Sequence, residues 1–257
     1  MLAAFTDEAA ARADILRIGQ LLHQKGLVAA SDGNISVRLE GGRILATPTS
    51  MSKGMMADED LVVTDLDGRK LDGKRNPSSE MAMHLLIYQL RPEVCGVVHA
   101  HPPVATGFAA AGIPLNQALL AEVVLALGCI PLAEYGTTGT PELGATLRPL
   151  IPHHDAILMA NHGVVTYGED VMKAYFKMET VEHFARIALV THLLGKQNLL
   201  DQDQVAKLMV ARQRYEGITS AAALAPNCPV LKDAPRPPQP APSGLPNRNW
   251  PNGKRRW

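Results

Sequence analysis

Two short apolar segments that each run into a histidine constrain the fold of this chain most strongly. Residues 95–103 read CGVVHAHPP, and residues 156–168 read AILMANHGVVTYG. Their length and β-branched content predict two buried strands. Side chains two positions apart on a strand share a face, so His99 and His101 can address one ion. His162 holds the corresponding place after the second strand, where a third imidazole can converge on the other two.

Helical and strand patterns alternate along the rest of the chain. Apolar residues at helical spacing predict long helices over residues 7–25 and 170–194. Alternation of this kind is typical of a layered α/β domain. Further strands are predicted in NISVRL and GRILATP around a turn at 40–42 and in LVVTDLDGRKL, and further helices after Pro77 and near 201–215.

Composition limits the kinds of partner that the chain can bind. The 257 residues carry 25 basic and 25 acidic side chains, and 46% of them are hydrophobic. That content is enough for one domain with an appendage. A balanced charge argues against nucleic acid or an anionic membrane as a partner. No apolar run of about 18 residues is free of charge, and acids stand where a secretory signal needs lysines, so a cytoplasmic protein is expected.

The three cysteines give no pattern of their own. Cys95, Cys129 and Cys228 are scattered and lack CxxC spacing. An odd, scattered set is typical of free thiols in a reducing cytoplasm, which is our expectation here.

Composition changes abruptly after Ala225. Nine prolines fall between Pro226 and Pro251, too many for a helix or a central strand. We therefore predict a folded unit over residues 1–225 and a proline-rich tail over 226–257. Both tryptophans of the protein lie in this tail, which favours docking across a subunit interface, while a loosely held extension is the alternative.

Three neutral imidazoles with one open position form the usual catalytic zinc arrangement. Glu80 begins the helix that runs into the first histidine strand, so its carboxylate is a candidate acid–base group beside the ion. Ordinary helix capping by Ser78, Ser79 and Glu80 is the alternative interpretation. The same helix start, with its free N–H groups and two hydroxyls, also suits an anion such as a phosphate.

Two polar turns, SDGN at 31–34 and TPTS at 47–50, offer further donors for an anion, although each alone is only a turn signal. Lys53 could add a charge, but an isolated lysine of this kind is typical of the surface. The remaining histidines considered, His84, His153, His154 and His183, are interpreted as structural or exposed.

Taken together, PSSE, HAHP and NHG, with SDGNIS upstream, resemble the class II aldolase/adducin family. The resemblance covers roughly residues 8–217, and the four separated motifs occur in the family's order. It implies a three-layer α/β/α sandwich around a mostly antiparallel sheet. It also implies a homotetramer with active sites at subunit interfaces.

By this resemblance the protein is a zinc-dependent aldolase, with Mn²⁺ or Co²⁺ as alternative metals. It would reversibly cleave a small ketose, specifically a ketose 1-phosphate, into dihydroxyacetone phosphate and an aldehyde through an enediolate held by the metal. The resemblance makes His99, His101 and His162 the metal ligands and Glu80 the catalytic residue. Its phosphate- and substrate-binding positions are Gly33, Asn34, Thr49, Ser50, Ser78, Ser79 and Tyr215.

The chain departs from the fuculose-phosphate aldolase pattern in three places. Residues 116–128 lack the tyrosine that serves as proton donor, Ser50 replaces a glycine, and Asp32 adds an acid beside the anion loop. The first departure leaves the proton donor unassigned, and the other two weaken the match to the family's phosphate-binding pattern. Epimerisation or decarboxylation of a sugar-acid phosphate and a non-catalytic adducin-like role remain as alternatives, although family epimerases tend to carry Asp in the PSSE position.

Overall fold

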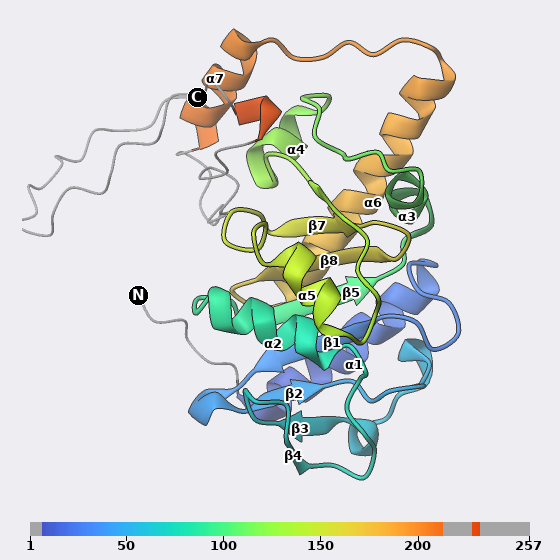
Figure 1. Ribbon diagram of the computed structural model, residues 1–257, viewed down its shortest axis with the longest axis vertical. Coiled ribbons are helices and arrows are strands. Elements are labelled where there is room, and N and C mark those ends of the chain that lie inside the picture. The colour runs from blue at the N-terminus through green and yellow to red at the C-terminus, as the bar shows by residue number, and fades with distance from the viewer. Residues whose placement is uncertain (1–6, 213–227, 232–257) are drawn as a thin grey trace, which may run out of the picture.

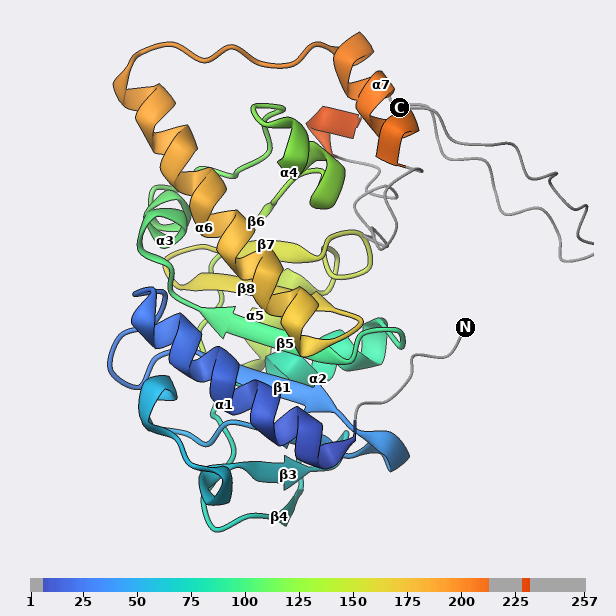
Figure 2. The ribbon, with the colours of Figure 1, turned by 180° about the vertical axis from the view of Figure 1, so that it is seen from behind.

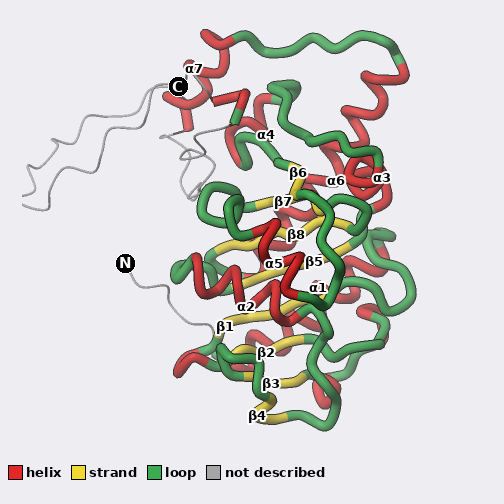
Figure 3. The backbone as a smooth tube through the Cα atoms, viewed as in Figure 1, coloured by secondary structure: helices red, strands yellow, loops and turns green. Residues whose placement is uncertain are grey.

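An eight-stranded sheet forms the middle layer of the protein. The computed structural model describes residues 7–212 and 228–231. The strand order is β4-β3-β2-β1-β5-β8-β7-β6, and Figure 3 shows the strands as one continuous yellow ladder. All neighbouring strands pair antiparallel except β6 and β7, which are parallel. The strands are β1 (Asn34–Arg38), β2 (Ile44–Ala46), β3 (Val62–Thr64), β4 (Lys70–Asp72), β5 (Gly96–Ala100), β6 (Leu132–Ala133), β7 (Ala156–Met159) and β8 (Gly163–Gly168).

Helices cover both faces of this sheet. Figure 2 shows α1, α3 and α6 against one face, and Figure 1 shows α2 and α5 against the other. The predicted α/β/α sandwich with a mostly antiparallel sheet is therefore confirmed. The helices are α1 (Glu8–Gln24), α2 (Met81–Leu90), α3 (Pro103–Ala110), α4 (Ala121–Ala126), α5 (Pro141–Leu147), α6 (Val171–Leu193) and α7 (Gln202–Arg212).

Two hydrophobic cores, one on each face, explain why the inner strand β7 is apolar throughout. Along β7, Ala156 and Leu158 pack into the core beneath α1 and α6. Ile157 and Met159 point the other way, into the core beneath α2 and α5. Successive side chains on a strand alternate between faces, so a sheet covered on both sides needs an unbroken apolar run.

Acidic caps define the two long helices. The Asp7 side chain accepts hydrogen bonds from the N–H groups of Ala9 and Ala10 at the beginning of α1. Asp170 accepts from the N–H of Lys173 at the beginning of α6. Such caps satisfy donors that have no partner within the helix. Both helices agree with the predicted ranges to within one residue at each end, whereas the short helices α4 and α5 were not predicted.

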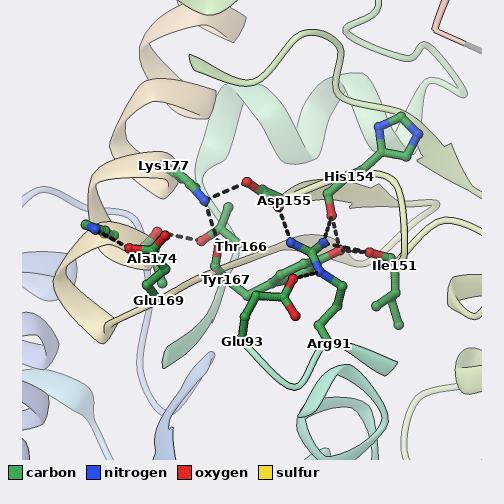
Figure 4. Close-up of polar contacts among 11 residues, drawn as sticks. Arg91, Glu93, Ile151, His154, Asp155, Thr166, Tyr167, Glu169, Ala174 and Lys177 are labelled. Atoms are coloured by element: carbon green, nitrogen blue, oxygen red, sulfur yellow. Dashed lines mark hydrogen bonds and ion pairs between the residues drawn. The ribbon is translucent and has the colours of Figure 1, made fainter. Parts of the chain in front are cut away.

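A buried ionic network joins the end of α2 to the β7–β8 hairpin and to α6 (Figure 4). Arg91 Nη2 donates to Asp155 Oδ1 at 3.0 Å, and Lys177 Nζ donates to Asp155 Oδ2 at 2.8 Å. The Tyr167 hydroxyl donates to the carbonyl of Ile151 at 3.2 Å. Burial raises the pKa of Asp155, but the opposing effect of Lys177 and Arg91 is larger, so the pKa lies below its ordinary value. These three charged groups therefore fix the hairpin that carries His162.

The prediction of free thiols is wrong for two of the three cysteines. Cys129 and Cys228 form a disulfide, with Cα atoms 6.0 Å apart although 99 residues separate them in sequence. They meet in a small apolar cluster with Val124 and Val230, a contact that cysteine spacing cannot reveal. Cys95 is a buried free thiol, as predicted.

The tail prediction falls largely outside the described residues. The boundary at 225/226 and both tryptophans lie there, as does the last part of the helix predicted near 201–215. Among the described helices, none is long and apolar enough to cross a membrane.

Candidate metal and substrate site

The ends of β5 and β7 bring three imidazoles together. His99 is fully buried on β5, and His101 follows it on the same face. His162 lies in the turn between β7 and β8, next to Asn161, whose φ is 56°. A Cβ at Gly163 would lie 2.6 Å from His101 Cδ2 and 2.7 Å from the Ala100 carbonyl oxygen. Only glycine allows this turn to approach β5 so closely.

The three histidines form a compact group of nitrogen donors. Nε2 of His101 lies 3.1 Å from Nε2 of His99. One ligand atom from each of the three side chains lies within 4.8 Å of the others. In a tetrahedral zinc site, bonds of about 2.0–2.1 Å place neighbouring nitrogens about 3.4 Å apart. The observed geometry is therefore of the size that a bound zinc ion requires.

The polar contacts behind the rings of His99 and His101 favour lone pairs pointing inward. His99 Nδ1 contacts the carbonyl oxygen of Val164 at 2.9 Å, and this oxygen can only accept. The proton of neutral His99 is thus on Nδ1, and Nε2 carries a lone pair. Nδ1 of His101 lies 3.4 Å from Asp32 Oδ2, which favours the same tautomer. Two facing lone pairs repel unless a cation lies between them, so the donor set fits a metal ion.

Glu80 completes the group. Its Oε1 lies 3.0 Å from His162 Nε2, and its Oε2 lies 3.4 Å from His99 Nε2. Oε1 is buried and has no hydrogen-bond partner of suitable geometry. Glu80 is also the N-cap residue of α2, but its side chain makes no capping hydrogen bond. The alternative interpretation, ordinary helix capping, therefore does not hold for the carboxylate, whereas Ser78 Oγ does accept a hydrogen bond from the Glu80 N–H at 3.2 Å.

The charges within the site follow from burial and proximity. Burial raises the pKa of Glu80, but His162 and His99 lower it more, so the carboxylate has a pKa well below its usual range. Burial, with help from His99 and His162, lowers the pKa of His101 to about 4. At neutral pH the site thus presents an ionised carboxylate and a neutral His101, which is a donor set for a divalent cation.

Three predicted anion-binding segments lie beside the histidines. Asn34 Nδ2 donates to Ser78 Oγ at 3.2 Å, which joins β1 to the beginning of α2. Pro48 and Pro77 form an isolated β-bridge that brings the 47–50 turn to the same place. Gly33 has φ 72°, and a Cβ there would lie 2.6 Å from the His99 carbonyl oxygen.

The hydroxyls in these segments are accessible to different degrees. Thr49 and Ser78 are half-buried, whereas Ser50 and Ser79 are exposed. Ser50 has φ 54°, a left-handed conformation that suits the glycine usual at this position in the family. Tyr215 lies outside the described residues.

The prediction that Lys53 lies on the surface, as an isolated lysine usually does, is wrong. Only 1% of it is exposed, and Nζ donates to the carbonyls of Ser31 at 2.9 Å and Met51 at 2.6 Å. It therefore ties the two polar turns to each other. Burial lowers the pKa of Lys53 to about 8, against the opposing effect of Asp32 and Glu80. A general surface preference cannot detect such a clamp, because both acceptors are backbone carbonyls and one of them, that of Ser31, belongs to another loop.

The other histidines agree with their predicted roles. His183 is exposed, and His154 is buried outside the site. His84 is fully buried and bonds to Asn34, which places it closer to the site than the sequence indicated.

Comparison with known proteins decides the family. A sequence profile described as the Class II Aldolase and Adducin N-terminal domain matches residues 13–189. The chain belongs to this family. The predicted resemblance is thereby confirmed, and with it the prediction of an enzyme of the class II aldolase type, a metal-dependent lyase.

Individual family members are similar over most of this chain. An L-fuculose phosphate aldolase from Methanococcus maripaludis is 35% identical over 181 residues, which cover 70% of this chain and 97% of that protein. A 3-oxo-tetronate 4-phosphate decarboxylase from Pectobacterium atrosepticum is 32% identical over 212 residues, which cover 80% of this chain and 95% of that protein. A solved structure of L-fuculose 1-phosphate aldolase is 29% identical, with a TM-score of 0.75, and the match covers 82% and 99% of the two chains.

Proposed function

We propose that this protein is a zinc-dependent aldolase that reversibly cleaves a ketose 1-phosphate into dihydroxyacetone phosphate and an aldehyde. The observation that carries the proposal is the convergence of His99, His101 and His162 with the Glu80 carboxylate, beside turns rich in hydroxyl groups. His99, His101 and His162 would hold the metal. When bound, the metal acts as a Lewis acid that draws electron density from the substrate carbonyl.

Glu80 is the proposed acid–base residue. In the synthetic direction its carboxylate removes a proton from the donor carbon next to the carbonyl, and in the cleavage direction it returns that proton. Its ionised state and its position beside the imidazoles support this role. The group that protonates the aldehyde oxygen in synthesis is left unassigned, because residues 116–128 contain no tyrosine.

The donor phosphate would bind at the beginning of α2. Backbone N–H groups at a helix N-terminus and nearby hydroxyls suit a dianion. Support comes from the junction of the 47–50 turn with the segment before α2 and from the Asn34–Ser78 hydrogen bond. The proposed contacts are Gly33, Asn34, Thr49, Ser50, Ser78 and Ser79.

One reconstitution experiment tests this function. The full-length protein is stripped of metal, reloaded with zinc and incubated with dihydroxyacetone phosphate and a panel of aldehydes, and the products are identified by mass spectrometry. We expect aldol products from the zinc-loaded protein and little from the His162→Ala variant. Equal rates with phosphorylated and unphosphorylated dihydroxyacetone would contradict the proposed phosphate site.

Decarboxylation of a 3-oxo sugar-acid phosphate is the second candidate. It is favoured by the 32% identity to the Pectobacterium decarboxylase over 95% of that protein. Both reactions need a metal beside a carbonyl, so the two candidates share the histidine site. Release of carbon dioxide from a 3-oxo acid phosphate, without any aldol product, would favour decarboxylation.

The proposed assembly is a homotetramer with active sites at subunit interfaces, as the family resemblance implies. Light scattering on the purified protein measures its mass directly. A monomer that retains full activity would contradict this part of the proposal.

A further inference from the structure

A line of buried polar groups runs between α2 and β1 beneath Glu80. The Tyr88 hydroxyl lies 2.8 Å from Ser36 Oγ, and Ser36 Oγ lies 2.7 Å from His84 Nδ1. His84 Nε2 is hydrogen-bonded to Asn34 Oδ1. Asn34 Nδ2 then donates to Glu80 Oε2 at 2.8 Å. None of the four residues that lead to Glu80 is more than 3% exposed.

The donors and acceptors in this line can be assigned by elimination. An ionised Glu80 only accepts, so the Asn34 group facing it is the NH₂ and the group facing His84 is the carbonyl oxygen. That oxygen only accepts, so His84 must donate from Nε2. Nδ1 of neutral His84 is then an acceptor, and the Ser36 hydroxyl must be its donor. Tyr88 in turn donates to Ser36.

Every hydrogen bond in the line therefore points toward Glu80. Donors aligned in this way polarise one another. A flip of the Asn34 amide would place its oxygen against the Glu80 carboxylate and its NH₂ against the N–H of His84. Both contacts would be unfavourable, so His84 selects one orientation of the Asn34 amide. Burial lowers the pKa of His84 to about 3, which keeps the ring neutral and the assignment unchanged at working pH.

We propose that His84 is a positioning residue for Glu80 and acts by fixing the amide of Asn34. In this arrangement both N–H bonds of Asn34 are already used, by Glu80 at 2.8 Å and by Ser78 at 3.2 Å. Asn34 thus holds the acid–base carboxylate in the resting site, and its proposed contact with the phosphate would require the side chain to release Ser78 or Glu80. The functional part of this inference rests on the proposed function, because it needs Glu80 to transfer a proton.

The tautomer of His84 tests the hydrogen-bond assignment without any substrate. Nitrogen-15 NMR of the histidine rings in the zinc-loaded protein distinguishes Nε2–H from Nδ1–H, and His84→Gln identifies the signal. We expect a neutral ring with the proton on Nε2. A proton on Nδ1 would overturn the inference, because His84 could then not donate to Asn34.

A matched pair of variants tests the consequence for Glu80. In His84→Gln the side-chain amide can occupy the place of Nε2 and still donate to Asn34. In His84→Asn the shorter amide can occupy only the place of Nδ1, so the donor to Asn34 is lost. The rate to measure is the exchange of the donor proton of dihydroxyacetone phosphate with deuterium oxide, which needs no aldehyde and reports on Glu80 alone.

We expect His84→Asn to slow this exchange at least about tenfold, because small misplacements of a reacting group are costly, and His84→Gln to stay within about threefold of wild type. Zinc content and melting temperature are measured in parallel. Equal exchange rates in the two variants, or losses that follow only their melting temperatures, would overturn the positioning role. If wild type exchanges no donor proton while the Nε2–H tautomer is present, the proposed function fails but the orientation of Asn34 stands.

Discussion

Glu80 Oε1 lies 3.0 Å from His162 Nε2, yet no hydrogen bond of suitable geometry joins them. A buried carboxylate oxygen without a partner is costly unless a cation or a transferred proton completes its environment. Within the site, Glu80 Oε1 shares this condition with His162 Nδ1, whereas Glu80 Oε2 accepts a hydrogen bond from Asn34.

The first prediction concerns this carboxylate. Glu80→Gln keeps the shape of the side chain but cannot accept a proton at neutral pH. We expect turnover to fall by about 10²–10⁴-fold while folding is retained. Steady-state kinetics and zinc analysis on the same preparation measure both effects. Near-wild-type turnover in this variant would mean that another group moves the proton.

Asp32 provides the second prediction. Its Oδ2 lies 3.4 Å from His101 Nδ1, so it favours the tautomer that leaves Nε2 free for a metal. Removing an outer partner of this kind typically weakens metal binding about 10–100-fold. We expect such a loss of zinc affinity in Asp32→Ala, measured by competition with a chelator. Asp67→Ala, at an exposed site on a distant turn, is the matched control.

The third prediction uses the buried ammonium of Lys53. Its folded-state pKa is about 8, below the value of about 10.4 expected for an unfolded chain. Between these two values the unfolded state binds more protons, so this group makes the free energy of unfolding rise with pH. In the metal-free protein, Lys53→Met should lack this rise between pH 8 and about 10.4. Urea unfolding at several pH values measures it, and the same slope in wild type and variant would contradict the assignment.

The fourth prediction concerns Asp155, which is 3% exposed at its side chain and holds both Arg91 and Lys177. Asp155→Ala leaves two cations without their buried partner, a change that typically costs about 3–5 kcal/mol. We expect a loss of this order in the free energy of unfolding. Asp155 has a lowered pKa, so its contribution is present above about pH 3.9 and is lost as the pH falls through the lower folded-state value. A variant that unfolds at the wild-type urea concentration would contradict this role.

The sequence predicted those features that depend on local pattern. Short apolar runs located the strands around His99 and His162, and helical spacing located α1 and α6 to within one residue at each end. The predicted surface location of Lys53 was wrong because its ammonium binds the carbonyl of Ser31, 22 residues away, which only the folded loops bring to it. The partners of His84 lie 48 and 50 residues away, so its role has no local pattern either.

Two glycines limit how this site can change over generations. Gly33 precedes β1 and Gly163 begins β8, so they flank the end of β5 from its two neighbouring strands. A side chain at Gly33 would press on the His99 carbonyl oxygen, and one at Gly163 would press on that of Ala100. In a library that carries every amino acid at each position, selection for activity should retain only glycine at positions 33 and 163. The hydroxyl-bearing turns nearby would tolerate substitutions, so the substrate preference can change there while the spacing of the imidazoles is kept.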